Sequence, residues 1–461
     1  MAKYDCCACE GFSAVRRIDN VSGMKKVGRM ADQDRSAETA PTARGCGPLR
    51  TCADRTAKPL AQQVFERIRS LGRVSRSDVA RDLRVSPGSV TSAVAGLMEA
   101  GLVREVPRVA RDTGTLRGRP PVDLSVIADA RHVLGLNLRD GLISAVVTDF
   151  TGQVLADAEL PVQPGARMLD AVLTDIARLI DRMLDPLGMA QGDLAAVGLG
   201  VPGFIDHAAG AVLWSPILRD RKVALAPVLA ARLGLPVHLD NDVNLLALAE
   251  LWFGMGREMS SFAVVTIEHG VGMGLILDTE LYRGARGMGL EIGHTTVQLD
   301  GALCRCGQRG CLEAYVADYA LVREASTALE WDLQTARPTE QTLDILYAQA
   351  KAGNEAARLI FERAGRYLSL GLANVIRVFD PELLLISGAR LRYDLLYAEE
   401  VLSDMHRFTD RIGRSRTEVA INTWGDTVWA RGGAALALAA VTDAVLAHPS
   451  TDLPARDRRT G

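Results

Sequence analysis

The sequence predicts an α/β protein in which two related lobes follow a small helical domain. From about residue 131 onward, short apolar strands alternate with amphipathic helices. The strand–strand–strand–helix–strand order that begins there starts again near residue 262. Before that point, residues 58–125 carry three short helical patterns followed by two short strands. The length of 461 residues is enough for two to four domains of about 100–200 residues each.

These patterns divide the chain into four parts. Residues 1–57 lack periodicity and are rich in Ala, Gly, Arg, Ser and Asp, so we expect a disordered extension. A helical domain spans 58–125, the two-lobed domain spans 131–445, and residues 446–461 form a flexible tail.

Composition and charge exclude several classes of protein. Apolar residues make up 48% of the chain and charged residues 24%, which is ordinary for a soluble globular protein. The sequence contains no uninterrupted apolar run of about 18 residues and no apolar signal segment at its start, so we expect a cytoplasmic protein without membrane contact. The net charge of −3 hides an asymmetry, because residues 58–122 hold twelve Lys/Arg against six Asp/Glu. A basic module on an acidic protein indicates a polyanion partner.

The helical domain has clear start and stop signals. Apolar residues recur at helical spacing over 60–71, and Gly72 ends that helix. Ser75 and Asp78 form a capping box for a second short helix. Ser86 caps a third helix, with Pro87 at its first position.

Two strands after the third helix complete a winged helix-turn-helix. Residues 102–106 and 121–124 are predicted to pair around a basic loop, the wing. The third helix then protrudes toward a major groove, and the thin cationic loop tip suits a minor groove. The alternative is a helical bundle whose arginines only solvate a surface. The candidate DNA-contacting residues are Ser86, Ser89, Thr91 and Ser92 on the helix and Arg117 and Arg119 on the wing.

The two lobes are predicted from apolar runs and one strongly amphipathic helix. Helices are expected at 168–184 and 244–252. The strands expected in the first lobe are 132–138, 143–149, 154–160, 194–201 and 237–239; those in the second are 262–267, 274–278, 281–282 and 383–386.

The eight cysteines fall into two groups. The first group lies in the extension and has spacings typical of no metal site, so we interpret it as part of a disordered tail, with metal binding or redox sensing as the alternative. Its members are Cys6, Cys7, Cys9, Cys46 and Cys52. We interpret the second group, Cys304, Cys306 and Cys311, as metal ligands in a cytosolic chain. Three buried free cysteines or a redox disulfide are the alternatives, although Cys304 and Cys306 are too close to pair without strain.

Several motifs together resemble the signature of the ROK family, which groups bacterial sugar-responsive repressors with sugar kinases. They are Glu291-Ile-Gly-His294, Cys304-Arg-Cys306-Gly-Gln-Arg-Gly-Cys311-Leu-Glu313, Gly203 in Val-Pro-Gly-Phe-Ile-Asp, and Asn241-Asp242-Val-Asn244. The resemblance covers roughly residues 59–445. It implies a two-lobed actin/hexokinase-like (ribonuclease H-like) fold, a sugar site in the cleft, and homodimers or homotetramers. In this family an N-terminal winged helix marks the repressor branch.

The cysteine motif fits a structural Zn2+ site. One imidazole from His294 and three thiolates from Cys304, Cys306 and Cys311 supply a tetrahedral ligand set with all four positions filled by protein. Gly307 and Gly310 allow the tight backbone that such a loop needs. In the family this zinc fixes the loop that carries sugar-contacting residues.

The resemblance also implies the sugar site. Asn241, Asp242, Glu291 and Glu313 match family positions that hold sugar hydroxyls, and His294 lies between metal and sugar. Gly203, in its own motif, completes the predicted sugar-binding set. Carboxylates suit this task because each can accept two hydroxyl protons. In ROK kinases the residue at the position of Asp242 is the general base, so it is catalytic here only if the protein is a kinase. The alternatives are helix capping for Asp240–Asp242 and an exposed helix-start carboxylate for Glu313.

The phosphate-binding loops of a kinase are altered. In place of Asp-x-Gly-Gly-Thr the chain has Asn137-Leu-Arg-Asp-Gly141, and in place of Gly-Thr-Gly-x-Gly it has Glu268-His-Gly-Val-Gly272. A carboxylate about 4 Å from a phosphate costs about 4 kcal/mol at an effective dielectric of 20. That cost corresponds to about a 1000-fold loss of nucleotide affinity, so we do not expect ATP to bind.

The sequence therefore predicts a sugar-responsive transcriptional regulator, a repressor of carbohydrate-metabolism genes, without catalytic activity. Its expected partners are a pseudo-palindromic double-stranded DNA operator, bound by a dimer, and a sugar or sugar-phosphate effector. The alternatives are an active ATP-dependent sugar kinase with an added DNA-binding domain and a regulator controlled by a partner protein.

Overall fold

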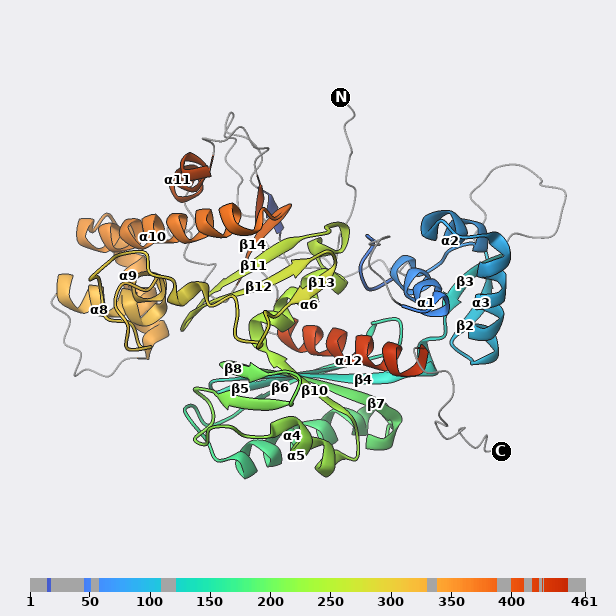
Figure 1. Cartoon of the computed structure of the whole chain (residues 1–461). Coiled ribbons are helices and arrows are strands. Elements are labelled where there is room, and N and C mark those ends of the chain that lie inside the picture. Colours follow the sequence, from blue (N-terminus) through green and yellow to red (C-terminus); the bar gives the residue numbers. More distant parts are fainter. Residues whose placement is uncertain are drawn as a thin grey trace. The chain divides into compact units, whose positions relative to one another are not determined.

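The computed structural model describes residues 15–17, 45–50, 58–108, 122–329, 338–387, 399–409, 417–422, 425 and 427–446. The chain divides into two compact units (Figure 1). Unit 1 comprises residues 1–40 and 259–428, and unit 2 comprises residues 41–258 and 429–461. Both units are built around a mixed sheet, which confirms the predicted α/β class.

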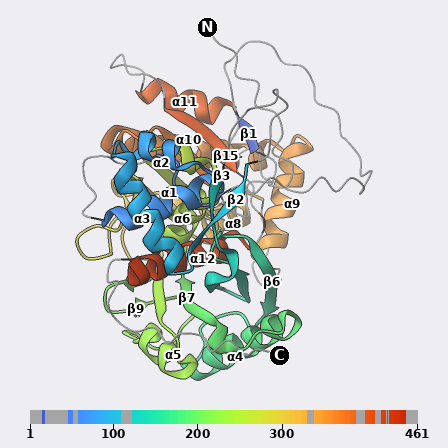
Figure 2. The same cartoon turned by 90° about the vertical axis from the view of Figure 1, so that its right-hand side faces the viewer.

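Unit 2 begins with a small head of three helices and a two-stranded sheet (Figure 2). Ser75 accepts a hydrogen bond from the backbone N–H of Asp78, and Ser86 accepts one from Ser89, so both predicted caps are confirmed. The connection from β2 to β3 lies largely outside the described residues. The elements are α1 (Leu60–Leu71), α2 (Arg76–Leu83), α3 (Pro87–Glu99), β2 (Val103–Pro107) and β3 (Val122–Val126).

The main sheet of unit 2 has the strand order β10-β7-β4-β5-β6. The pairs β10–β7 and β7–β4 are parallel, and β4–β5 and β5–β6 are antiparallel. Figure 1 shows α4 and α5 on one face of this sheet and α12 on the other. The strands are β4 (His132–Arg139), β5 (Leu142–Thr148), β6 (Val154–Pro161), β7 (Leu194–Val201) and β10 (Val237–Asn241); the helices are α4 (Leu169–Leu184), α5 (Leu225–Leu233), α6 (Asp242–Phe253) and α12 (Val428–Leu446).

Shorter elements connect these parts of unit 2. A hairpin of β8 and β9 follows the end of β7, and four single 3-10 turns join the larger elements. They are β8 (Phe204–Asp206), β9 (Ala211–Trp214), η1 (Ala128–Ala130), η2 (Asp185–Leu187), η3 (Gln191–Asp193) and η4 (Met255–Glu258).

Glycines let α12 approach the sheet at backbone distance. A Cβ atom on Gly135 of β4 would lie 1.9 Å from the carbonyl oxygen of Ala430, and one on Gly198 of β7 would lie 1.9 Å from that of Gly433. By length and composition α12 could cross a membrane, but 67% of its apolar window is buried inside the protein. We therefore interpret α12 as a core helix.

Unit 1 repeats the strand pairing of unit 2. Its sheet has the order β1-β15-β14-β11-β12-β13, in which β15–β14 and β14–β11 are parallel and β11–β12 and β12–β13 are antiparallel. The strands are β1 (Val15–Arg17), β11 (Phe262–Ile267), β12 (Val271–Leu277), β13 (Glu280–Tyr282), β14 (Leu383–Ser387) and β15 (Glu418–Asn422). The helical elements are η5 (Ile292–His294), α7 (Glu313–Val316), α8 (Asp318–Ala328), α9 (Thr339–Lys351), α10 (Glu355–Phe379) and α11 (Glu399–Thr409).

The N-terminal extension differs in part from the expectation. Residues 1–57 were expected to be disordered, yet the structure pairs β1 with β15 and holds residues 45–50 against the body of unit 2 by backbone hydrogen bonds. Cys46, assigned from the sequence to a tail, is 3% exposed because it lies against α1 and Gly152. The other residues of the extension, including Cys6, Cys7, Cys9 and Cys52, and most of the tail 446–461 lie outside the described residues.

The close approach of α12 yields a stability prediction. Gly198→Ala should destabilise the protein by about 1–3 kcal/mol, because the added methyl group overlaps a backbone oxygen that cannot rotate away. Urea unfolding of purified protein measures the change. The matched control is Gly96→Ala on the exposed side of α3, where nothing lies within 4 Å of the new Cβ and the better helix propensity should leave stability unchanged or raise it. Equal unfolding midpoints for Gly198→Ala and the wild type would contradict this packing.

Candidate functional site

A compact loop between η5 and α7 in unit 1 gathers one histidine and three cysteines. Thr296 pairs with Cys311, and Leu303 pairs with Arg309, so the chain forms two short bridges in succession. His294 lies at the end of η5, just before this loop, which we call the knuckle (residues 295–312). A Cβ on Gly310 would lie 1.7 Å from the carbonyl oxygen of Gln298, and Gly310 has a φ of 79°, so only glycine fits there.

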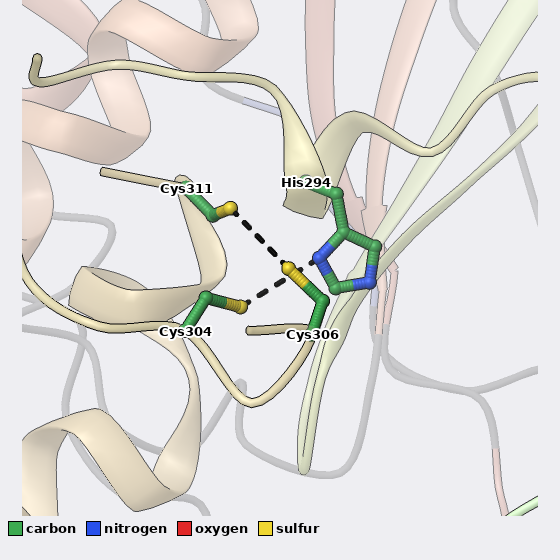
Figure 3. Close-up of side chains that lie close together, drawn as sticks. All are labelled: His294, Cys304, Cys306 and Cys311. Carbon is green, nitrogen blue, oxygen red and sulfur yellow. Dashed lines mark hydrogen bonds between the residues drawn. The ribbon is translucent and has the colours of Figure 1, made fainter. Parts of the chain in front are cut away.

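The four side chains converge on one point (Figure 3). Their ligand atoms all lie within 4.8 Å of one another. The sulfur of Cys304 is 3.7 Å from Nδ1 of His294, and the sulfurs of Cys306 and Cys311 are also 3.7 Å apart. These separations match a tetrahedral zinc ion, whose Zn–S and Zn–N bonds place two sulfurs about 3.8 Å apart and a sulfur and a nitrogen about 3.6 Å apart. The donor set therefore fits a closed metal site.

Without a bound cation, the surroundings shift the pKa values of the three thiols in different directions. Burial raises the pKa of Cys304, and it raises that of Cys311 to about 12 with help from the neighbouring thiols. Burial also opposes ionisation of Cys306, but hydrogen bonds from the Gln308 backbone and the other two thiols lower its pKa on balance. A divalent cation would compensate the charge of the thiolates that burial disfavours.

Two further residues, Glu313 and Tyr319, contact the sulfur of Cys304. The hydroxyl of Tyr319 donates to it at 3.5 Å, and Oε1 of Glu313 lies 3.8 Å away. The other carboxylate oxygen of Glu313 accepts from the backbone N–H of Val271 at 3.4 Å. Through the hydrogen bond to Val271, Glu313 joins the knuckle to the β11–β12 turn. It is 8% exposed, so the alternative of an exposed carboxylate at a helix start is wrong. Sequence reasoning missed Tyr319, which carries no motif of its own.

Glu291 precedes η5 and lies at the surface of unit 1. Partial desolvation raises its pKa, the charge of His294 opposes that rise, and the charge of Glu313 adds to it. The structure thus brings Glu291, His294 and Glu313 together around the knuckle.

The remaining predicted sugar residues gather in unit 2, where β10 ends and α6 begins. Asn241 caps α6 by accepting from the backbone N–H of Val243 at 2.9 Å, and its amide donates to the carbonyl of Gly203 at 3.0 Å. Gly203 has a φ of 116°, and a Cβ there would lie 2.2 Å from the carbonyl of Trp214. Asp242 is the first residue of α6 and also accepts from Val243. Asn241 therefore caps α6, as the alternative interpretation of the sequence expected, and its sugar contact stays a prediction.

A buried carboxylate, Asp240, orders this polar turn. Asp240 is 2% exposed, and its Oδ1 accepts from the backbone N–H of Asn241 and from the side chain of Asn244, both at 2.8 Å. Its Oδ2 lies 3.5 Å from Nδ1 of His207, which is 2.7 Å from the carbonyl of Leu239. From the sequence, Asp240 was interpreted only as a possible helix cap. His207 was not identified, because it contacts Asp240 from a distant part of the chain.

The candidate DNA-contacting residues of α3 are exposed. The hydroxyl of Thr91 donates to the carbonyl of Pro87, and those of Ser86 and Ser89 share a hydrogen bond. Ser92 lies on the same exposed side. The wing residues Arg117 and Arg119 lie outside the described residues.

The two segments expected to correspond to the kinase phosphate loops make local contacts within their own units. Arg139 stacks on Trp429 with its guanidinium carbon 4.7 Å from the ring centroid. The Glu268–Gly270 turn closes on itself, because the N–H of Glu268 donates to the carbonyl of Gly270. A Cβ on Gly270 would lie 2.9 Å from the carboxylate of Glu313.

Comparisons with known proteins give one family. Residues 134–440 match the model described as the ROK family. The chain is 30% identical over 352 residues to the DNA-binding transcriptional repressor Mlc of Escherichia coli (strain K12), covering 75% of this chain and 84% of Mlc. It is 28% identical over 337 residues to the xylose repressor of Caldicellulosiruptor bescii, covering 71% of this chain and 82% of that repressor.

Solved structures of ROK family proteins also align with this chain. A ROK family transcriptional regulator described as a homologue of Mlc aligns with a TM-score of 0.67 and 27% identity, covering 84% of this chain and 97% of that regulator. The ROK hexokinase of Thermus thermophilus aligns with a TM-score of 0.58 and 30% identity, covering 68% of this chain and 99% of the hexokinase. Both alignments fit the two-lobed fold expected from the sequence.

The thiol pKa values yield a prediction for metal binding. Zinc loading should release at least about two protons per ion, because Cys304 and Cys311 hold theirs at neutral pH in the metal-free protein, and affinity should fall as pH is lowered. Calorimetry in two buffers of different ionisation enthalpy measures the release. Cys311→Ser should lose the bound metal, while Cys46→Ala, a cysteine in the other unit, should retain one equivalent. Full zinc content in Cys311→Ser would contradict the site.

Proposed function

The chain belongs to the ROK family, and from that premise we propose that it is a cytoplasmic, sugar-responsive transcriptional repressor of carbohydrate-metabolism genes. The named repressors among its relatives support this function. Its head would bind operator DNA, and its ROK domain would bind a sugar or sugar phosphate.

The observation that carries the proposal is the share of this chain that each similar solved structure covers. The ROK hexokinase is covered over 99% of its own length yet accounts for only 68% of this chain, whereas the ROK regulator accounts for 84%. The regulator therefore matches a segment that the kinase lacks. The head α1–β3 precedes the ROK match, and its helix-turn-helix order supports DNA binding.

The surface of α3 supports this role of the head. Ser86, Ser89, Thr91 and Ser92 are exposed hydroxyls suited to phosphates or base edges. Cationic side chains are needed for affinity, and the wing residues Arg117 and Arg119 are the candidates. A homodimer or homotetramer would present two heads to a pseudo-palindromic operator.

Two polar groups support sugar binding by the ROK domain. Glu291, His294 and Glu313 form one, and Gly203, Asn241 and Asp242 form the other. Nδ1 of His294 faces the cysteines, and its Nε2 points away from them (Figure 3), so Nε2 is available to donate to a hydroxyl. A structural zinc ion on the four ligands would hold His294 in place, and Glu313 is fixed separately by the backbone N–H of Val271.

We further propose that the ROK domain does not transfer phosphate. Arg139 stands where the kinase loop has glycine, and its stacking on Trp429 fills the position with a side chain. Glu268 adds a carboxylate to the second loop, which repels phosphate. Retention of Asp242 leaves ATP-dependent hexose phosphorylation as the competing activity.

A sugar-binding experiment tests the ROK domain. Melting temperature of the zinc-loaded protein, measured with D-xylose, D-glucose, N-acetyl-D-glucosamine and their phosphates, should rise with one of them, because a ligand of the native state stabilises it. Asp242→Asn and Glu291→Gln should each weaken that ligand at least about tenfold by loss of a charged acceptor, about 1.4 kcal/mol or more. Asp181→Asn, on the exposed side of α4, is the matched control and should bind like the wild type. ATP-dependent turnover of a hexose that Asp242→Asn abolishes would instead establish a kinase.

A salt titration tests the head. Arg119→Ala should weaken binding to many DNA sequences alike and reduce the slope of log affinity against log salt by about 1, because one phosphate contact is lost. Fluorescence anisotropy with a labelled duplex measures both. Arg232→Ala, on the exposed end of α5, should change neither. Identical slopes for Arg119→Ala and the wild type would remove Arg119 from the interface.

A further inference from the structure

A buried arginine, Arg69, joins the head to the ROK domain within unit 2. It lies on α1 and is 3% exposed. Its guanidinium carbon is 4.5 Å from the ring centroid of Trp252, 5.3 Å from that of Phe65 and 5.9 Å from that of Phe150. Trp252 belongs to α6 and Phe150 follows β5, so rings from three elements surround one cation from the head.

Helix α12 contacts α1 at the same place. Nη1 of Arg69 donates to the hydroxyl of Thr442 at 2.8 Å, and the side-chain amide of Gln62 donates to Asp443 at 2.6 Å. Nε of Arg69 is buried without a partner among the described atoms. Burial lowers the pKa of Arg69, and the charges of Cys46, Glu66 and Asp443 oppose that shift. A cation with so few polar partners depends strongly on each one it has.

Residues 45–50 form a strap that fastens α1 to the end of α6. The N–H of Cys46 donates to the carbonyl of Arg69, and the N–H of Gly47 donates to the carbonyl of Trp252. Arg257 donates to the carbonyls of Gly47 and Ser70, at 3.0 and 2.6 Å. A Cβ on Gly45 would lie 2.1 Å from the carbonyl of Arg69, so the strap lies directly against the α1 backbone.

The other end of α6 carries the proposed sugar residues. Asn241 caps the helix and Asp242 is its first residue, while Trp252 lies one residue before its end. A Cβ on Gly432 would lie 1.8 Å from the carbonyl of Leu245, so α12 crosses α6 at backbone contact. The packed helices α6 and α12 therefore connect the Asn241–Asp242 turn to Arg69 by continuous contacts.

We propose that Arg69, held between Trp252 of α6 and Thr442 of α12, is the positioning residue that couples sugar binding in the ROK domain to DNA binding by the head. The proposal rests on the proposed function. A shift of α6 would take the ring of Trp252 away from Arg69, and a shift of α12 would break the hydrogen bond to Thr442. Because a buried cation tolerates the loss of neither contact, the head would have two distinct positions rather than a continuous range. By linkage, the sugar and the DNA would each weaken the other by one common factor.

Variants of Thr442 and Arg69 test the coupling in the full-length, zinc-loaded protein. Thr442→Val keeps the shape and removes the acceptor, Thr442→Ser keeps the hydroxyl and is the matched control, and Arg69→Met keeps an apolar stem without charge. The probe is a duplex selected by the wild-type protein from a random library. Its affinity is measured with and without the sugar that raises the melting temperature, and sugar affinity is measured alone.

In the wild type and in Thr442→Ser, the sugar should weaken the duplex by a factor within about 5–150. In Thr442→Val and Arg69→Met this factor should fall toward one, while sugar affinity stays within about threefold, less than 1 kcal/mol. A merely structural role for Arg69 would lower the melting temperature and leave the factor intact, so that result overturns the proposal. Thr442→Val decides the question if Arg69→Met does not fold. A wild-type protein that shows no factor with any sugar contradicts the proposed function itself, before any variant is compared.

Discussion

The structure of unit 2 depends on how helix α6 is held at its two ends. At the polar end, Asn241 caps the helix and donates to Gly203, while the buried carboxylate of Asp240 fixes both Asn241 and Asn244. At the aromatic end, Trp252 stacks on Arg69 of the head. The helix between is buried along most of its length, so it cannot bend at little cost. A rigid helix with a ligand-binding end and a head-binding end is the physical basis of the regulator proposed here.

In unit 1, a metal ion rather than a set of hydrogen bonds would order the residues next to the proposed sugar site. The four ligands of the knuckle can share one ion, which would cross-link this loop. Glu313, which follows the knuckle, accepts a hydrogen bond from the backbone N–H of Val271 and is thereby joined to the sheet. We propose that a kinase-like fold has become a sensor in this way: the groups that suit a sugar are ordered, and the loops that would bind phosphate carry Arg139 and Glu268 instead.

The sequence predicted most of the sheets, because buried strands read as apolar runs between glycines and polar residues. Strands β7 and β11 agree with their predicted bounds. Helix α12 was missed, since a helix of Ala, Gly and Leu that is buried between a sheet and another helix has no polar stripe. The metal ligands were predictable from spacing, because they are close in the chain. Arg69, Cys46, His207 and Tyr319 were not, because each depends on a partner distant in sequence, and an arginine beside Ile68 on an amphipathic helix looks like any surface residue.

A single thermodynamic cycle tests whether sugar binding and DNA binding are coupled in this protein. Calorimetric titration of the effective sugar into the zinc-loaded protein, with and without saturating operator duplex, measures the coupling from the sugar side. We expect the duplex to weaken sugar binding by the same factor by which the sugar weakens duplex binding. Equal sugar affinity with and without the duplex, in a protein that binds both, would contradict it.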